Sequence, residues 1–352
     1  MYPALAIIAE LDRSVEVLWV GSEGGMEASL VERAGVRFVS VPAAGLHGVG
    51  PRALPGNLGQ LARGVVAARR ILKGFRPHAL LLTGGFVGVP VSVAARRVPK
   101  LVYVPDIEPG QALRLMARFA DCLAVTAEET LARLPRRGRA CVTGYPTRPG
   151  LRHGDRALAR EHFGLTSALP VVLVFGGSKG ARSINEAVWD SLEDLLSLAQ
   201  IVHLTGSLDW PRTEARRQVL PSELAQRYHP FAYLHDEMVH ALAAADLAVA
   251  RAGASTLGEL PLFGLPAVLV PYPHAWRYQR VNAEYLASHG GGVSLADGEL
   301  AGQLMPLIRQ LLGDPPRLES MRTAMRRMAR PQAAAEIAVE VEKLLDEGGR
   351  RG

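Results

Sequence analysis

The chain has 352 residues, nearly half of them hydrophobic, which suits about two domains with large apolar cores and excludes a largely disordered protein. Its formal net charge of +6 favours an anionic partner, but without an RNP motif, zinc-finger spacing or a dense basic arm, nucleic acid is the least favoured one. The two cysteines argue against a disulfide scaffold and suit a reducing cytoplasm. The sequence has no uninterrupted run of 18 apolar residues, so we expect no membrane-spanning helix.

In the first half of the chain, short apolar runs alternate with longer amphipathic segments. Residues 15–21, 79–85, 101–106 and 122–127 are rich in Val or Leu and end at turn-forming or polar residues, which is typical of buried strands. Residues 58–75 have the spacing of an amphipathic helix. The alternation predicts a parallel sheet with helices on both faces.

The same pattern restarts in the second half. The candidate strands there are residues 170–177, 199–206, 247–253 and 266–273. A stretch with Pro and Gly at residues 143–165 separates the two sets, which places a domain boundary near 150–165. Residues 318–345 are rich in Ala, Arg and Glu and predict helix, broken at Pro331. The predicted fold class is therefore α/β, with two doubly wound domains facing a cleft.

A glycine-rich turn, "GGSKGARSIN" at residues 176–185, follows a predicted strand directly. Ligands of open α/β sheets bind beyond the carboxyl ends of the strands, where such a turn exposes backbone N–H groups beside a helix N-terminus. We interpret it as a phosphate-binding turn, in which Ser178 adds a hydroxyl and Lys179 or Arg182 a positive charge. The alternative is a tight turn that needs glycine for packing alone, and Walker-loop spacing is absent.

A second polar stretch, "RAGASTLGEL" at residues 251–260, also follows an apolar strand and opens a helix. Ser255 and Thr256 can donate hydrogen bonds, and the Glu259 carboxylate can hold two neighbouring hydroxyls, as on a ribose. The alternative for Glu259 is an acid favoured by the dipole of the helix, and the sequence leaves both readings open.

A third polar stretch covers residues 271–286, where His274, Gln279 and Asn282 lead into a helix. Side-chain amides suit sugar hydroxyls because each amide offers both a donor and an acceptor. The alternative is helix capping and ordinary surface polarity, which explains most single Gln or Asn residues.

Together these stretches resemble the MurG family over essentially the whole chain. "GGSKGARSIN" is similar to the family's GGSQGAR-x-x-N, and residues 251–283 are similar to its R-[SA]-GA-x-T-x-x-E…GLPA…P…H…Q-x-x-NA. In the first half, "GLHGVG" (45–50), "GGFVGVP" (84–90) and "GYPTR" (144–148) resemble GLRGKG, GGY-x-S-x-P and GNPVR. The combination is specific, although no single motif is.

The resemblance implies the GT-B fold, in which two Rossmann-like domains face a cleft. MurG enzymes transfer N-acetylglucosamine from UDP-N-acetylglucosamine to undecaprenyl-pyrophosphoryl-MurNAc-pentapeptide (lipid I), with inversion, and form lipid II for peptidoglycan. Residues 1–150 would form the acceptor- and membrane-facing domain, residues 151–335 the UDP-sugar-binding domain, and residues 336–352 a C-terminal helix and tail. The resemblance also implies no metal or cofactor, and a peripheral location on the cytoplasmic face of the cell membrane.

The resemblance assigns binding roles to the matching positions. The glycine turn would line the donor diphosphate, Glu259 would hold the ribose, and Gln279 with Asn282 would address the sugar. Arg148 would lie near the donor across the cleft, and the backbone around His235 would contact the uracil. The implied substrate-binding residues are Arg148, Gly176, Gly177, Ser178, Gly180, His235, Arg251, Ser255, Thr256, Glu259, Gln279 and Asn282.

The chain departs from the family at two places that concern the acceptor. The family begins with a strand and a glycine loop whose His is the expected general base, and Met1 falls one residue after that His. We expect that an internal codon was taken as the start and that the first sheet lacks its central strand. "YVPD", residues 103–106, stands where the family has HEQN. The catalytic residue is thus unassigned, with Asp106 and Glu108 as weak candidates.

A lipid acceptor calls for an apolar patch with a basic rim on the first domain, suited to an anionic membrane surface. The predicted helix at 58–75 offers both kinds of side chain, although its apolar face also suits the core. The apolar residues are Leu58, Leu61, Val65, Leu72 and Phe75, and the cations are Arg63, Arg69, Arg70, Lys73, Arg76, Arg96, Arg97 and Lys100.

Two other functions stay open on the sequence alone. A UDP-N-acetylglucosamine 2-epimerase shares this fold, also binds UDP with paired loops, and acts on the donor without any lipid. A nucleotide-sugar-binding protein without catalysis would bind UDP but release none from the donor when the acceptor is supplied.

Overall fold

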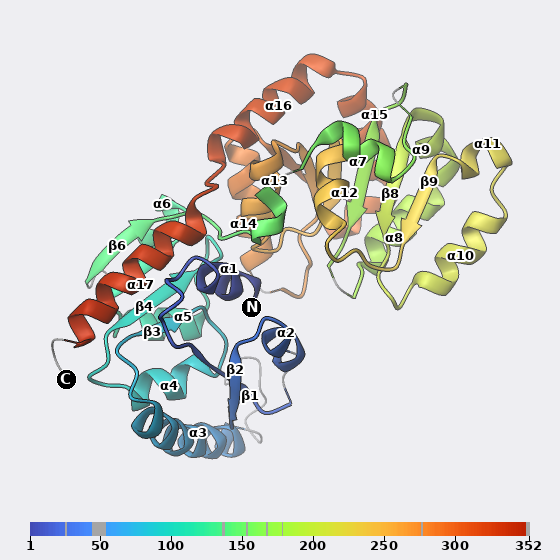
Figure 1. Cartoon of the computed structure of the whole chain (residues 1–352). Coiled ribbons are helices and arrows are strands. Elements are labelled where there is room, and N and C mark those ends of the chain that lie inside the picture. The colour runs from blue at the N-terminus through green and yellow to red at the C-terminus, as the bar shows by residue number, and fades with distance from the viewer. Residues whose placement is uncertain are drawn as a thin grey trace. The chain divides into compact units, whose positions relative to one another are not determined.

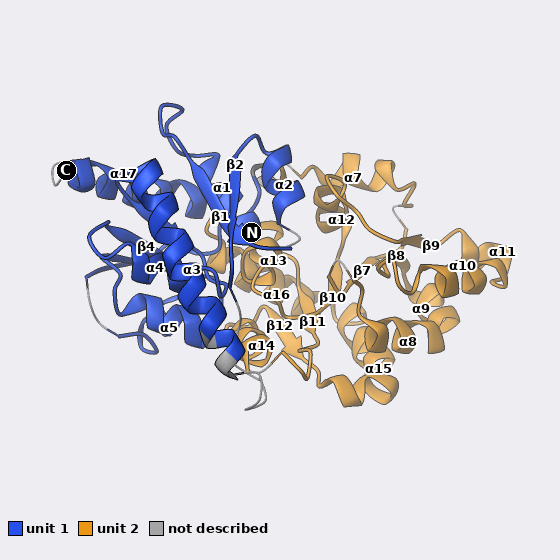
Figure 2. Cartoon of the chain, turned by 90° about the horizontal axis from the view of Figure 1, so that it is seen from below, with its two compact units in different colours: residues 1–148, 332–352 blue, residues 149–331 orange. Residues whose placement is uncertain are grey.

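The computed structural model describes residues 1–24, 27–43, 54–135, 138–152, 154–166, 168–177, 179–275 and 277–349. The chain forms two compact units (Figures 1 and 2). Unit 1 comprises Met1–Arg148 and Gln332–Gly352, and unit 2 comprises Pro149–Pro331. The C-terminal helix therefore belongs to the same unit as the start of the chain.

Unit 1 is built on parallel strands in two separate sheets. Its strands are β1 (Leu18–Ser22), β2 (Arg37–Val41), β3 (Leu80–Leu82), β4 (Lys100–Val104), β5 (Cys122–Val125) and β6 (Arg139–Val142). Its helices are α1 (Tyr2–Ile8), α2 (Ala28–Arg33), α3 (Leu54–Phe75), α4 (Gly88–Ala94), α5 (Gln111–Ala117), α6 (Glu128–Leu131) and α17 (Ala333–Gly349). One sheet has the order β1-β2 and the other the order β3-β4-β5-β6.

The central strand β4 shows how the larger sheet of unit 1 forms a core on both faces. Successive side chains of a strand point to opposite faces, and all five residues of β4 are buried. Leu101 and Tyr103 pack in one cluster with Ile337 of α17, while Val102 and Val104 pack in another with Met116 of α5. Figure 1 shows α17 lying along this sheet beside α1. The predicted helix break at Pro331 is confirmed, since one helix ends at Met328 and the next begins at Ala333.

Unit 2 contains one continuous parallel sheet of six strands within the described residues. Its strands are β7 (Val171–Phe175), β8 (Gln200–Leu204), β9 (Tyr228–Phe231), β10 (Leu247–Ala250), β11 (Ala267–Leu269) and β12 (Gly292–Ser294). Its helices are η1 (Pro149–Arg152), α7 (Arg156–His162), α8 (Arg182–Asp190), α9 (Leu192–Leu198), α10 (Trp210–Gln218), α11 (Ser222–Ala225), α12 (Met238–Ala244), α13 (Thr256–Phe263), α14 (Tyr278–Ser288), η2 (Asp297–Glu299), α15 (Leu300–Leu312) and α16 (Pro315–Met328).

The strand order β12-β11-β10-β7-β8-β9 is that of a Rossmann sheet read from its far edge. The first strand of the unit, β7, lies at the centre, between β8 and β10. Its residues Val172 and Val174 pack against helices α8, α9 and α15 in one core cluster. The predicted Rossmann-like parallel architecture is confirmed, and the sequence order changes direction at β7, which is where such sheets bind ligands.

Candidate functional site

The predicted donor-binding residues of unit 2 follow neighbouring strands of its sheet. The glycine turn follows β7, Arg251 and the small residues after it follow β10, and the stretch that contains Gln279 follows β11. The carboxyl ends of parallel strands lie at the same edge of a sheet, so the topology gathers these three stretches at one edge. Sequence separation alone could not establish that β7 and β10 are adjacent.

The glycine turn after β7 shows two separate reasons for lacking side chains. A Cβ at Gly180 would lie 2.1 Å from the carbonyl oxygen of Thr205, and one at Gly176 would lie 2.6 Å from the nitrogen of Ala181. These two glycines are needed for packing within and between the loops. Gly177, by contrast, has a φ of +115° and open space where its Cβ would be. A ligand can approach the backbone there, while Ser178 lies outside the described residues.

Helix α8 begins directly after this turn and has no side-chain cap. Its N-cap is Ala181, which cannot satisfy the N–H groups of the first turn, so these donors and the partial positive charge of the helix favour an anion. Of the two predicted cations, Arg182 donates to Asp209 at 2.9 Å. Lys179 is exposed on the turn itself. Lys179 is therefore better placed than Arg182 to meet a diphosphate.

Arg251 is an anchor between several loops. Its guanidinium is nearly buried and pairs with Asp297 of η2, and it donates to the Ser183 hydroxyl of α8 at 2.7 Å. It also donates to the carbonyl of Val270, at the end of β11, at 3.3 Å. Arg251 therefore fixes the start of α8 relative to β10 and β11. Asp297 was missed by sequence reasoning because a single acid in a short loop carries no recognisable pattern.

The first turn of α13 holds the three predicted polar residues in different environments. Ser255 is the N-cap, and the buried Thr256 hydroxyl donates to the carbonyl of Gly253 at 2.6 Å. Thr256 therefore stabilises the turn, and its proton is committed to the backbone. Glu259 is half-buried one turn into the helix. Because α13 follows β10, the Glu259 carboxylate belongs to the edge of the sheet at which the glycine turn lies.

Gln279 and Asn282, both on α14, are used in different ways. The Gln279 side-chain carbonyl accepts a hydrogen bond from the backbone N–H of Tyr272 at 2.9 Å. Asn282 is fully buried, and its amide donates to the carbonyl of Ala252 at 3.1 Å. Asn282 therefore holds α14 against the loop after β10 and reaches no surface. His274 is exposed and packs edge-on against the ring of Tyr272.

The segment after β9 places His235 on the surface. Its backbone N–H donates to the Glu237 carboxylate at 3.2 Å, and its ring packs edge-on against Tyr233. Hydrogen bonds from the backbone N–H groups of Glu237 itself and of His235 lower the pKa of Glu237. The segment is thus a surface turn that precedes α12, and the Glu237 carboxylate accepts a hydrogen bond from its backbone.

A buried histidine in unit 2 was not singled out from the sequence. His203 on β8 is fully buried between the Tyr228 hydroxyl and the Asn185 amide oxygen, both 3.0 Å from its ring nitrogens. Burial lowers the pKa of His203 to about 3, so the ring is neutral at pH 7. Asn185 also donates to Asp209 at 2.9 Å. His203 therefore holds the side chain of Asn185 on α8 in place and does not exchange protons at pH 7.

The candidates in unit 1 are two acids in the loop after β4 and Arg148, which is the last residue before the chain enters unit 2. Both carboxylate oxygens of the buried Glu108 are occupied, one by Arg114 and the other by Arg133 at 2.7 Å. Asp106 is half-buried in the same loop. The Arg148 guanidinium stacks over the Tyr2 ring, 4.7 Å from its centroid. Glu108 is therefore a structural acid.

The predicted apolar patch of unit 1 lies on different residues. Leu61, Val65, Leu72 and Phe75 of α3 are half-buried, and the side chain of Leu58 lies outside the described part. Lys100 is buried and donates to the carbonyl of Val98 at 2.7 Å, so it does not belong to the basic rim. The exposed large apolar side chains of unit 1 on α3, α4, α5 and the adjoining loops are Val66, Phe86, Val93, Leu115 and Phe119.

The predicted cations, apart from Lys100, gather mainly in one groove of unit 1. A groove of about 700 Å³ at the ends of α3 and α4 is lined by the basic residues Arg69, Lys73, Arg76, Arg96 and Arg97. In the described part of the chain, no helix has both the length and the apolar character needed to cross a bilayer. A basic groove of this kind suits an anionic partner.

Comparison with known proteins assigns the chain to a family. Residues 1–125 match the glycosyltransferase family 28 N-terminal domain, and residues 171–337 match the C-terminal domain of that family. A relative from Roseiflexus sp. (strain RS-1) is 43% identical over 368 aligned residues, which cover 93% of this chain and 83% of the relative. Its name is UDP-N-acetylglucosamine--N-acetylmuramyl-(pentapeptide) pyrophosphoryl-undecaprenol N-acetylglucosamine transferase.

Solved structures share the fold. MurG from Acinetobacter baumannii superposes with a TM-score of 0.77 at 23% identity, over 97% of this chain and 95% of the other. UDP-GlcNAc 2-epimerase from Neisseria meningitidis, bound to UDP-GlcNAc, gives a TM-score of 0.67 at 13% identity, over 97% and 98%. The predicted family and fold class are confirmed: the chain belongs to glycosyltransferase family 28, within it to the MurG family, and has the GT-B fold of two Rossmann-like domains.

Proposed function

We propose that the protein transfers N-acetylglucosamine from UDP-N-acetylglucosamine to undecaprenyl-pyrophosphoryl-MurNAc-pentapeptide, with inversion, giving lipid II for peptidoglycan synthesis. The observation that carries this proposal is the 43% identity, over 93% of the chain, to a transferase named for this reaction. The acceptor hydroxyl oxygen attacks the anomeric carbon while the bond from that carbon to the diphosphate oxygen breaks. The sugar passes to the acceptor, and UDP leaves with the bonding electron pair.

The donor is held by unit 2 in this proposal. The open backbone at Gly177 and the uncapped start of α8 support a diphosphate site, with Lys179 adding positive charge. Glu259 binds the ribose hydroxyls, and the backbone around His235 binds the uracil. Arg251 acts by fixing the loops relative to one another rather than by contacting phosphate, because its guanidinium already pairs with Asp297.

Acceptor chemistry belongs to unit 1 in this proposal. The attacking hydroxyl must lose its proton, and Asp106 is the acid that we retain as a candidate acceptor for it. The ion pairs of Glu108 with Arg114 and Arg133 are instead expected to stabilise the loop. The exposed apolar side chains on α3, α4, α5 and the adjoining loops, and the basic groove at the ends of α3 and α4, support peripheral binding to an anionic membrane, where the lipid acceptor resides.

The experiment is to follow UDP release from UDP-N-acetylglucosamine with and without the lipid acceptor, for the protein and for Glu259→Gln. We expect acceptor-dependent release, and for Glu259→Gln a loss of UDP affinity of about 10- to 100-fold because the carboxylate's hydrogen bonds to two hydroxyls weaken. Glu284→Gln, on the exposed face of α14, is the matched control and should bind UDP normally.

Other outcomes would assign a different function. Formation of the C2 epimer from the donor alone would indicate an epimerase, whose fold similarity is clear but rests on 13% identity. Binding of UDP without acceptor-dependent release would indicate a non-catalytic nucleotide-sugar-binding protein. Metal removal by a chelator should leave release unchanged, because the helix dipole and cations of the site stabilise the leaving diphosphate.

A further inference from the structure

The helix α10 (Trp210–Gln218) begins at an acid that does not cap it. Asp209 is the N-cap of α10, but within the described residues its side chain accepts no hydrogen bond from the first turn of that helix. An aspartate at this position ordinarily accepts from a backbone N–H of the first turn and so stabilises its own helix. Asp209 is also buried, with only 2% of its surface exposed, so its carboxylate oxygens need other partners.

Both carboxylate oxygens of Asp209 are used by side chains of α8 (Arg182–Asp190). One oxygen accepts from the Arg182 guanidinium, 3.2 Å from its Nε and 2.9 Å from a terminal nitrogen. The other oxygen accepts from the side-chain amide of Asn185 at 2.9 Å. Arg182 is the first residue of α8, and Asn185 lies in the same first turn. An acid at the start of one helix therefore holds the start of another.

The Asn185 amide also joins α8 to the end of β8 (Gln200–Leu204) and the loop after it. Its nitrogen donates to the carbonyl of Thr205 at 2.9 Å, and its oxygen lies 3.0 Å from Nε2 of His203. Since the Asn185 oxygen can only accept, His203 carries its proton on Nε2. That leaves Nδ1 of the ring to accept from the Tyr228 hydroxyl at 3.0 Å. Every polar atom of the Asn185 side chain thus has a partner, which fixes the orientation of the amide.

The loop after β8 meets the glycine turn backbone to backbone. A Cβ at Gly206 would lie 2.3 Å from the nitrogen of Gly180, and one at Gly180 would lie 2.1 Å from the carbonyl oxygen of Thr205. The Thr205 carbonyl therefore touches the glycine turn and accepts from Asn185 at the same time. A shift of the Asn185 amide would be transmitted through this carbonyl to the turn, which includes the open backbone at Gly177.

We propose that Asp209, acting through Asn185 and Arg182, is a positioning residue for the donor diphosphate. It sets the direction of the N–H groups of the glycine turn and of the first turn of α8, which bind the diphosphate in the proposed function on which this inference rests. As a charge alone, a carboxylate bonded to the first residue of α8 would repel a diphosphate at that helix terminus. Positioning and charge therefore predict opposite effects when the carboxylate is removed.

The test is calorimetric titration of UDP and of uridine into the protein and into Asp209→Asn, which removes the charge with almost no change of shape. We expect the affinity for UDP to fall at least about tenfold, because an amide cannot accept from Arg182 and Asn185 at both of its ends. The affinity for uridine, which has no phosphate, should change less than about twofold, because its proposed contacts belong to other loops. Tighter binding of UDP would mean that Asp209 acts as a charge alone and would overturn the proposal.

Glu186→Gln is the matched control for the charge and for the two helices. Glu186 of α8 pairs with Arg212 of α10 at 3.1 Å, and both side chains are about half exposed. The substitution removes the same charge from the same pair of helices without touching the buried network. We expect its affinity for UDP to equal that of the unchanged protein, and a loss as large as that of Asp209→Asn would contradict the role of the buried carboxylate.

Asn185→Ala tests the same network from its other side. It should weaken UDP binding at least about tenfold and spare uridine, because the Thr205 carbonyl is no longer held. Equal losses for UDP and uridine, in whichever of Asp209→Asn and Asn185→Ala folds, would indicate general loosening of unit 2 and exclude positioning. The unchanged protein separates the two proposals: if it binds no UDP, the proposed donor site fails and the inference falls with it. UDP binding that both variants leave intact overturns the inference alone.

Discussion

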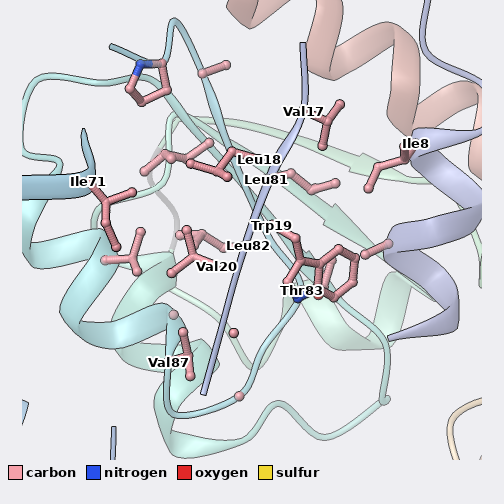
Figure 3. A pocket seen from close by; sticks show the side chains of 18 of the residues that line it. Ile8, Val17, Leu18, Trp19, Val20, Ile71, Leu81, Leu82, Thr83 and Val87 are labelled. Atoms are coloured by element: carbon pink, nitrogen blue, oxygen red, sulfur yellow. The ribbon is translucent and has the colours of Figure 1, made fainter. Parts of the chain in front are cut away.

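The sheets of the two units differ in continuity: in the described part of the chain, unit 2 has one sheet of six strands, whereas unit 1 has one sheet of two strands and one of four. In unit 2 the first strand, β7, lies at the centre of the sheet, and its four residues before Phe175 are almost fully buried between two neighbouring strands. In unit 1 most residues of β1 and of β3 are only half-buried, and a cavity lies between the two strands (Figure 3). The central strand of unit 2 thus joins the halves of its sheet and also delivers the glycine turn to the proposed donor site.

The loops at the carboxyl ends of the strands also differ between the two units. In unit 2 the turn after β7 touches the loop after β8, so that Gly180 and Thr205 meet backbone to backbone. In unit 1 the loop after β3 contains Gly84 and Gly85, and Gly85 has open space around its missing Cβ. The donor site of unit 2 is therefore built by close packing of loops, and substitutions there should be costly in a way that similar substitutions in unit 1 are not.

The largest effect is expected from alanine at Gly180, with alanine at Gly85 as its matched control. Both glycines have a φ of +80°, which costs a side chain about 1–2 kcal/mol at either position. At Gly180 the new Cβ would also collide with the Thr205 carbonyl, which adds about 1–3 kcal/mol. We expect Gly180→Ala to lower the free energy of unfolding by about 3 kcal/mol in urea titrations and to weaken UDP binding strongly.

Gly85→Ala should cost only the conformational part and leave UDP binding intact. Equal losses of stability for the two variants would contradict the view that loop packing distinguishes unit 2 from unit 1.

A somewhat smaller effect is expected from Asp297→Asn, which removes the charge that partners Arg251. Since both side chains are mostly buried, an uncompensated guanidinium would remain near Ser183 and Val270. The expected loss of unfolding free energy is about 2 kcal/mol, and UDP affinity should fall because the start of α8 is no longer fixed. Glu284→Gln breaks an exposed pair with Arg280 and should cost less than about 0.5 kcal/mol. If the two variants are equally stable, Arg251 is not the anchor that we describe.

Acid should weaken unit 2 through His203. Its folded-state pKa lies below the ordinary value of 6.5, so its contribution to stability is complete above pH 6.5 and is lost as pH falls from 6.5 toward 3. At pH 5 this linkage removes about 2 kcal/mol from the free energy of unfolding. Urea unfolding at pH 7 and pH 5, followed by emission from Trp189 beside His203, measures it. His203→Gln should reduce the difference between the two pH values; an unchanged difference would assign the acid sensitivity to other groups.

Much of this architecture was predictable from sequence, for identifiable reasons. Strands such as β4 and β7 are continuous apolar runs because helices cover both of their faces, and such runs are easily recognised. Strands β2, β9 and β12 lie at sheet edges and carry polar or exposed residues, so no continuous apolar run marks them in the sequence. Length was also no guide, because β12 has only three residues.

Part of the candidate site could be predicted from local motifs, and the rest depends on how the chain folds. The glycine turn was recognisable because glycine spacing is local, but its explanation is split, with Gly180 needed for loop packing and Gly177 facing open space. Asn282 was predicted near the sugar, and its complete burial against Ala252 depends on how α14 packs, which no local pattern encodes. The pairing of Arg251 with Asp297 joins residues 46 positions apart and needed the fold.

The smallest effect concerns the surfaces of the two units. Arg97 lines the basic groove of unit 1, whereas Arg309 is an exposed cation on α15 of unit 2. A cation close to an anionic bilayer contributes about 1 kcal/mol, so Arg97→Gln should weaken binding to phosphatidylglycerol-containing vesicles about fivefold in sedimentation assays. Arg309→Gln removes the same charge from the whole protein and should change binding little. Equal weakening by both substitutions would mean that net charge, rather than the basic groove of unit 1, governs attraction to the membrane.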